Sequence, residues 1–144
     1  MRKYLFLLFM FILAKCAMDY SVSSFLVNSS NDSIDIMIQY NQTYIDSIFQ
    51  GDRKKSVQSL KNSNDANGIK YELDTLNLSS HYILNPGGKM QIDKTVGGYG
   101  IVPDHVLIKQ ITIRKNGIKY MYHQRNFDTL FRKSNRALWE WTIQ

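Results

Sequence analysis

Cysteine is scarce in this sequence, which has a single one, Cys16, among 144 residues. No disulfide can therefore form within the chain, and an exported domain without disulfides has to rely on its core for stability. Long hydrophobic runs are lacking too. The main apolar segment extends from Tyr4 to Ala14, well short of the roughly 20 residues that a helix needs to cross a bilayer. This length argues against a transmembrane anchor.

A strong charge of one sign is also lacking. The formal net charge is +6, and subtracting the three basic residues around the apolar segment, Arg2, Lys3 and Lys15, leaves +3 for the rest. A nucleic-acid-binding domain carries a clustered basic face. This weak charge does not indicate such a face, so we expect no nucleic-acid partner.

The residues of common catalytic and metal sites are sparse and scattered. The three histidines, His81, His105 and His123, lie too far apart in the sequence for a local metal motif. Asp104 precedes His105 and the two are a candidate acid/base pair, but no serine lies in a nucleophile-elbow sequence. The glycine-rich stretch 97–100 matches neither the P-loop nor the dinucleotide fingerprint. We therefore predict no catalytic residue, no metal and no cofactor.

The N-terminal segment has the layout of an export signal. A basic start, Met1-Arg2-Lys3, is followed by the apolar run and then by small residues, which is what the secretion machinery recognises. Its end, Leu13-Ala14-Lys15-Cys16, resembles the lipobox of bacterial lipoproteins, although Lys15 stands where that family has Gly, Ala or Ser. The resemblance implies a lipid on Cys16. The alternatives are an A-x-A-like cleavage before Ala17 and an uncleaved peptide.

These features divide the chain into a signal peptide over residues 1–16 and one β-rich exported domain over residues 17–144, which is the size of one ordinary domain. The chain is rich in Asn, Ile, Lys and Tyr, and in this composition it is similar to short lipoproteins of Bacteroidota that have no assigned role. The resemblance implies a place in the cell envelope, either anchored by lipid or free in the periplasm or outside the cell.

Alternating apolar and polar residues predict strands in the exported domain. The alternation is clearest from Ser33 to Tyr40, and we expect the stretch from Ser21 to Val27 to pair with it as a hairpin. The segment 43–60 fits either a short helix begun by Thr43 or a strand. Farther on, one or two strands before residue 84 and another from Lys89 to Asp93 are expected, and then a surface loop.

The C-terminal part is the easiest to interpret. Two apolar runs flank Asn116-Gly117, a pair that suits the positive φ angles of a type I′ turn, so residues 105–123 are predicted to form a hairpin. A short helix capped by Asn126 follows, with Phe127, Leu130 and Phe131 on one face. The chain then ends in a strand.

Turns rather than long helical crossovers join these elements. The expected fold is therefore mainly β, an antiparallel β-sandwich of about seven strands with one short helix near the C-terminus, and the alternative is a small α+β domain.

Several side chains suit binding better than chemistry. Aromatic residues make adaptable contacts at interfaces, and the candidates are Tyr99, Tyr120, Tyr122, Trp139 and Trp141. For the two tryptophans we favour core packing, since Ile143 continues their row. The basic runs 53–55 and 132–136 can touch lipid phosphates, but a solvated face is the simpler interpretation.

The sequence thus favours a non-catalytic, envelope-associated binding or structural module over an enzyme. Its expected partners are the membrane, through a lipid on Cys16, and an envelope protein or a glycan. The alternative is a small secreted or periplasmic hydrolase, which requires Asp104 and His105 to converge in a concave pocket with a further ionisable group.

Overall fold

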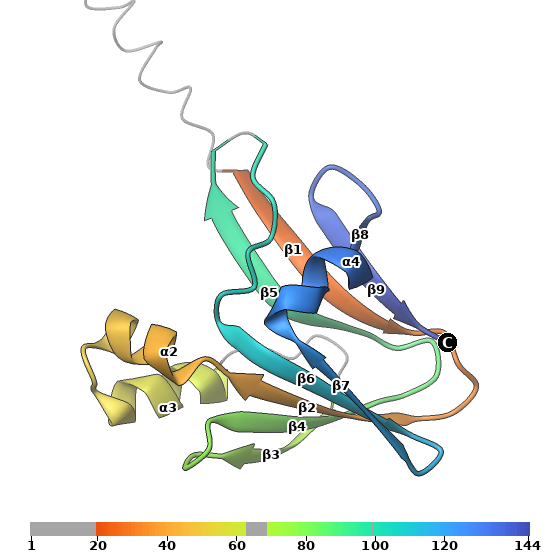
Figure 1. The fold of residues 1–144 in the computed structure, drawn as a ribbon, viewed down its shortest axis with the longest axis horizontal. Coiled ribbons are helices and arrows are strands. Elements are labelled where there is room, and N and C mark those ends of the chain that lie inside the picture. The colour runs from red at the N-terminus through yellow and green to blue at the C-terminus, as the bar shows by residue number, and fades with distance from the viewer. Residues whose placement is uncertain (1–19, 63–68, 99) are drawn as a thin grey trace, which may run out of the picture.

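The computed structural model describes residues 20–62, 69–98 and 100–144, and the fold is mainly β (Figure 1). One sheet has the spatial order β5 (Lys89–Gly97), β1 (Tyr20–Asn28), β9 (Leu138–Ile143) and β8 (Arg132–Lys133). The other has the order β3 (Ile69–Asp74), β4 (Ser79–Leu84), β2 (Ile34–Tyr40), β6 (Ile108–Lys115) and β7 (Ile118–His123). The helices are α2 (Gln42–Phe49), α3 (Arg53–Asn62) and α4 (Phe127–Leu130), with a 3-10 turn, η1 (Gln124–Asn126), before α4.

The mainly β class and the short helix near the C-terminus are confirmed. The described residues form nine strands rather than about seven. One pair, β1 with β9, is parallel, whereas the other pairs between described strands are antiparallel. The ambiguous segment 43–60 contains two helices, and β5 extends to Gly97, four residues beyond its predicted end.

The predicted hairpin between the first two strands is wrong. β1 pairs with β5 and β9, whereas β2 pairs with β4 and β6 in the other sheet. The buried Asn28 side chain stabilises the connection from β1 to β2, where the chain passes from one sheet to the other. Its amide nitrogen donates hydrogen bonds to the Asp32 and Leu84 carbonyl oxygens at 2.8 and 2.9 Å. Each strand buries alternate residues. A regular alternation identifies strands, but it does not say whether two of them share a sheet.

Local signals at turns and caps succeed in one place and fail in others. Asn116 and Gly117 have φ angles of 51° and 75°, and Lys115 pairs with Ile118, so the predicted hairpin is confirmed. Asn41 rather than Thr43 caps α2, because its side-chain oxygen accepts a hydrogen bond from the Tyr44 backbone N–H at 3.3 Å. Asn126 makes no capping hydrogen bond, and α4 has only four residues.

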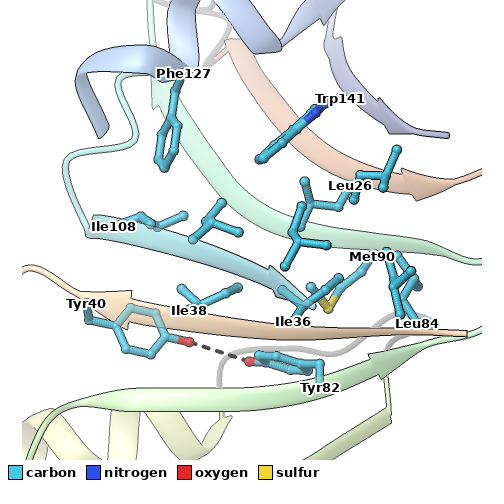
Figure 2. Packing of buried hydrophobic residues seen from close by; sticks show 14 of the residues in the cluster. Leu26, Ile36, Ile38, Tyr40, Tyr82, Leu84, Met90, Ile108, Phe127 and Trp141 are labelled. Atoms are coloured by element: carbon cyan, nitrogen blue, oxygen red, sulfur yellow. Dashed lines mark hydrogen bonds between the residues drawn. The ribbon is translucent and has the colours of Figure 1, made fainter. Parts of the chain in front are cut away.

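One hydrophobic core receives side chains from both sheets and from the segment around α4. Figure 2 shows Leu26, Met90 and Trp141 on the side of the first sheet, facing Ile36 and Ile38 of the second. Phe127 and Phe131, at the two ends of α4, are also buried in this cluster. The core therefore joins the N-terminal strand, the central hairpin and the C-terminal strand into one packed unit.

Candidate functional site

The structure brings together three of the five aromatic residues that the sequence suggested for binding. Tyr120, Tyr122 and Trp141 line one groove of about 420 Å³ between β7 and the end of β9. Trp139 lies elsewhere, in a cavity beside His105. Tyr99 is outside the described residues, and so is the lipidation candidate Cys16.

The groove lies on the core-facing side of β7, beside the last residues of β9. In β7, Tyr120 and Tyr122 are opposite Ile113 and Ile111 of β6, so they continue the row that faces the core. The last pair of this row is Lys115 with Ile118 at the hairpin tip. β9 contributes Trp141 and Ile143 to the lining, while Ile118 and Tyr120 of this row stay exposed. We call this feature the aromatic groove, and it is lined by Lys115, Ile118, Tyr120, Tyr122, Trp141 and Thr142 among others.

The floor of the aromatic groove is buried, whereas side chains at its mouth are exposed. Tyr122 meets Trp141 edge to face, with ring centroids 4.6 Å apart and planes at 78°, a geometry that adds stability beyond burial. Trp141 is buried, as the sequence favoured for its row, whereas Tyr120 and Ile118 keep 44% and 55% of their surface exposed. Exposed apolar side chains beside a groove are typical of an interaction surface.

β7 is also an edge of its sheet. It lies at the end of the five-stranded order and pairs with β6 alone among the described strands. An unpaired strand edge offers a row of backbone N–H and C=O groups to another chain. The aromatic groove therefore lies beside a strand edge to which a peptide in extended conformation can add as a further strand.

The candidate acid/base pair, Asp104 and His105, does not form a solvent-accessible unit in the structure, because His105 is buried. His105 is 3% exposed, and it adopts a left-handed backbone conformation with φ of 50°. Its Nε2 lies 2.9 Å from the hydroxyl of Ser24, which is fully buried. The ring stacks on Phe131 at 4.7 Å and meets Phe127 edge to face at 5.4 Å. His105 is held as part of the core.

The charges around His105 come from three carboxylates. Burial lowers the pKa of His105 overall, while the negative charges of Asp93, Asp104 and Asp128 act in the opposite direction. Burial also raises the pKa of Asp93, an effect that the charge of His105 partly offsets. The neutral form of the imidazole is thus favoured, and the surrounding field is negative.

The convergence required for a hydrolase is incomplete. The cavity of about 210 Å³ beside His105 contains Asp128 rather than Asp104. Asp104 is exposed, and its carboxylate accepts a hydrogen bond from the Val106 backbone N–H at 3.3 Å. Ser24 and His105 are in contact, but Ser24 has no exposed surface from which to attack a substrate.

Sequence reasoning missed Ser24, Asp93, Asp128 and Phe131 as neighbours of His105. They come from β1, β5 and the α4 segment, which are far apart in the chain. No local motif carries this information. The aromatic groove had a visible signal, since Ile118, Tyr120 and Tyr122 alternate along one strand.

The basic runs have separate environments. Arg53 donates from its guanidinium group to the carbonyl oxygens of Thr75 and Leu76, so it ties α3 to the chain that follows β3. Lys55 forms an exposed ion pair with Asp52 at 3.4 Å. Arg132, Lys133 and Arg136 are exposed along β8 and the turn after it.

Metal and membrane features were sought in the part of the chain that the structure describes. No group of three or more His, Cys, Asp or Glu residues suited to a metal ion occurs there. None of the described helices has the length and hydrophobicity to cross a membrane. No protein family, curated protein or solved structure matches this chain.

Proposed function

We propose that this protein is a non-catalytic binding module of the cell envelope, tethered by a lipid on Cys16, that captures an extended segment of a protein partner in the aromatic groove. The observation that carries the proposal is the exposure of Tyr120 and Ile118 on the core-facing side of a strand edge. Side chains in such positions are normally covered by the opposite sheet. Here both stay exposed and are available to contact a partner.

The groove and the edge together favour a peptide in extended conformation. A strand added to β7 would gain main-chain hydrogen bonds, and every second side chain would point into the groove. Lys115 at the groove and Lys119 on β7 supply positive charge. We therefore expect a segment that alternates apolar with polar residues and carries acidic side chains, as charge complementarity requires.

In the β-sandwich that we infer, a lipid tether on Cys16 and the groove would lie at opposite ends of the domain. Cys16 is four residues before Tyr20, which limits the tether to about 14 Å. The groove lies at the other end of β1, where Asn28 pairs with Ile143, about 27 Å away along the strand. A lipid on Cys16 would thus hold the start of β1 near the membrane and leave the groove facing away from it.

The groove is tested by peptide selection on the mature protein purified from cells that express the full chain. A displayed library of 12-residue random peptides provides the probe, and a selected peptide is titrated by tryptophan fluorescence. We expect Tyr120→Ser to weaken its binding about tenfold, the loss of roughly 1.4 kcal/mol that one exposed aromatic anchor supplies. Tyr44→Ser is the matched control, since Tyr44 is a tyrosine of similar exposure, 37%, on α2.

Two outcomes would contradict the peptide proposal. One is a selected peptide that binds the Tyr120→Ser and Tyr44→Ser variants equally well. The other is that no peptide is selected while soluble peptidoglycan fragments bind in a Tyr120-dependent manner, which would make the partner a glycan.

The tether is tested separately by the intact mass of the mature protein from its native host. We expect a mass that fits acylated Cys16 and the loss of the acyl mass in a Cys16→Ser variant. A chain that begins at Ala17, or one that retains residues 1–16, would contradict the lipid tether.

A hydrolase remains the competing function because of the 2.9 Å contact between Ser24 and His105. That function requires an accessible nucleophile. We expect a fluorophosphonate probe to leave the folded protein unlabelled. Labelling that Ser24→Ala abolishes would replace the binding proposal with a catalytic one.

A further inference from the structure

A second cavity, separate from the aromatic groove, lies beside α4 and the first part of β9. It has a volume of about 210 Å³ and is lined by Val102, Pro103, His105, Asp128, Phe131 and Trp139. We call it the Trp139 cavity. It is smaller than the roughly 300–1,000 Å³ of pockets that hold drug-sized ligands, so its size suits a ligand of only a few heavy atoms.

Aromatic rings make up much of its wall. Phe131 and His105 are stacked with planes only 27° apart, and Phe127 packs against both of them edge to face. Phe127 and Phe131 are fully buried, which fixes these rings in place. Trp139 is half-buried and comes from a different element, β9. The wall therefore combines buried rings of the core with the half-buried Trp139.

The remaining wall carries one negatively charged side chain, Asp128. Asp128 is exposed in the first turn of α4, and no salt bridge between described residues engages it. Asp93 and Asp104 act electrostatically on the same histidine. Neither of these two residues lines the cavity, so Asp128 supplies its carboxylate. Burial lowers the pKa of His105, which favours the neutral form of its ring.

Four basic residues flank the cavity residues in the sequence: Arg125 and Arg132 on either side of Asp128, and Lys133 and Arg136 before Trp139. Arg132 and Lys133 are exposed, and Lys133 is paired with Trp139 in the β8–β9 ladder. Between described residues, the cation–π contact that the structure contains is at another place, where the Lys89 ammonium lies 4.4 Å from the Phe25 ring centroid. No cation–π contact between described residues involves the rings of the Trp139 cavity.

We propose that the Trp139 cavity binds a small organic cation, an amine or quaternary ammonium group, held against the Trp139 ring beside the Asp128 carboxylate. Aromatic faces attract such cations through their quadrupole, and partial desolvation strengthens the attraction. The aliphatic walls from Val102 and Pro103 suit methyl groups on nitrogen. This site is independent of the aromatic groove, and its failure would leave the peptide proposal untouched.

The test uses tetramethylammonium and choline as probes on the full mature protein, by isothermal titration calorimetry. 3,3-Dimethylbutan-1-ol is the control ligand, because it has the shape of choline without the charge. We expect choline to bind and the neutral alcohol to bind about tenfold more weakly, since the cation–π and carboxylate attractions require the charge.

Two variants and a matched control locate the site. We expect Trp139→Leu to weaken choline binding about tenfold and Asp128→Asn about threefold. Asp32→Asn is the control, since Asp32 is an exposed aspartate in the turn between β1 and β2, and it should have no effect. Urea unfolding checks that each variant is folded. If Trp139→Leu does not fold, the Asp128→Asn variant still tests the site.

Equal affinity for choline and the neutral alcohol, or unchanged choline binding in Asp128→Asn and Trp139→Leu, would overturn the proposal. No heat of binding for either ammonium compound would also overturn it. Vesicles of phosphatidylcholine distinguish the source of the cation. Binding to vesicles that free choline displaces indicates a lipid headgroup, whereas binding of choline alone indicates a free compound.

Discussion

Two aromatic regions of this protein share Trp141 and differ in what covers them. On one side, Trp141 meets Phe131 edge to face at 5.8 Å, and Phe131 continues to His105 in a closed cluster. On the other side, Trp141 meets Tyr122 at 4.6 Å, and the row continues to the exposed Tyr120. The α4 segment packs into the first region, whereas Tyr120 in the second stays 44% exposed. Similar rings in similar geometry thus become core in one place and surface in the other.

The largest expected loss of stability comes from a substitution in the closed cluster of Trp141, Phe131 and His105. Phe131→Ala should destabilise the protein by about 3–5 kcal/mol, since it removes a fully buried ring and leaves a cavity. Urea unfolding followed by circular dichroism measures the change. A loss below about 1 kcal/mol would show that the cluster is not a core element.

His105→Asn is expected to have an intermediate effect. Asn accepts the left-handed conformation of this position, so the change isolates the loss of the ring and of its contact with Ser24. We expect a cost of about 1–3 kcal/mol at neutral pH. Retention of full stability would mean that the Ser24–His105 contact is dispensable.

The same variant changes the dependence of stability on pH. Because burial lowers the pKa of His105 below its ordinary 6.5, the unfolded chain binds a proton first as the pH falls below 6.5, and the stability of the native protein decreases. His105→Asn should flatten this decrease. Asp93, whose pKa is raised, acts with the opposite sign, so Asp93→Asn should steepen it. Parallel pH profiles of unfolding for all three proteins would contradict this account.

The smallest expected effect on stability comes from a substitution in the aromatic groove. Tyr120→Ser should change the free energy of unfolding by no more than about 0.5 kcal/mol, as for most exposed positions, although it should weaken the binding of a selected peptide. Thermal unfolding of this variant beside Phe131→Ala gives the sharpest contrast between the two regions. A loss comparable to that of Phe131→Ala would show that the aromatic groove is part of the core.

The sequence predicted the local features of the fold well and the long-range ones poorly. Asn116-Gly117 specifies its own turn, and alternation marks β2 and β7, because these signals act between neighbouring residues. The sheet partners of β1 could not be read, since pairing with β5 and β9 depends on contacts across most of the chain.

The candidate sites divide in the same way. Tyr120 and Tyr122 were found because they alternate along one strand with a recognisable turn before it. Their meeting with Trp141, and the placement of Asp128 and Trp139 around one cavity, depend on how β9 and α4 pack on the sheets. No pattern within a single segment carries that information.

The most direct test of the aromatic groove is a nuclear magnetic resonance titration of the mature, ¹⁵N-labelled protein with a selected peptide. We predict that the amide signals that change most belong to residues 118–123 of β7 and that the indole signal of Trp141 changes with them. Changes concentrated on α2 or around His105, with β7 unaffected, would contradict the account.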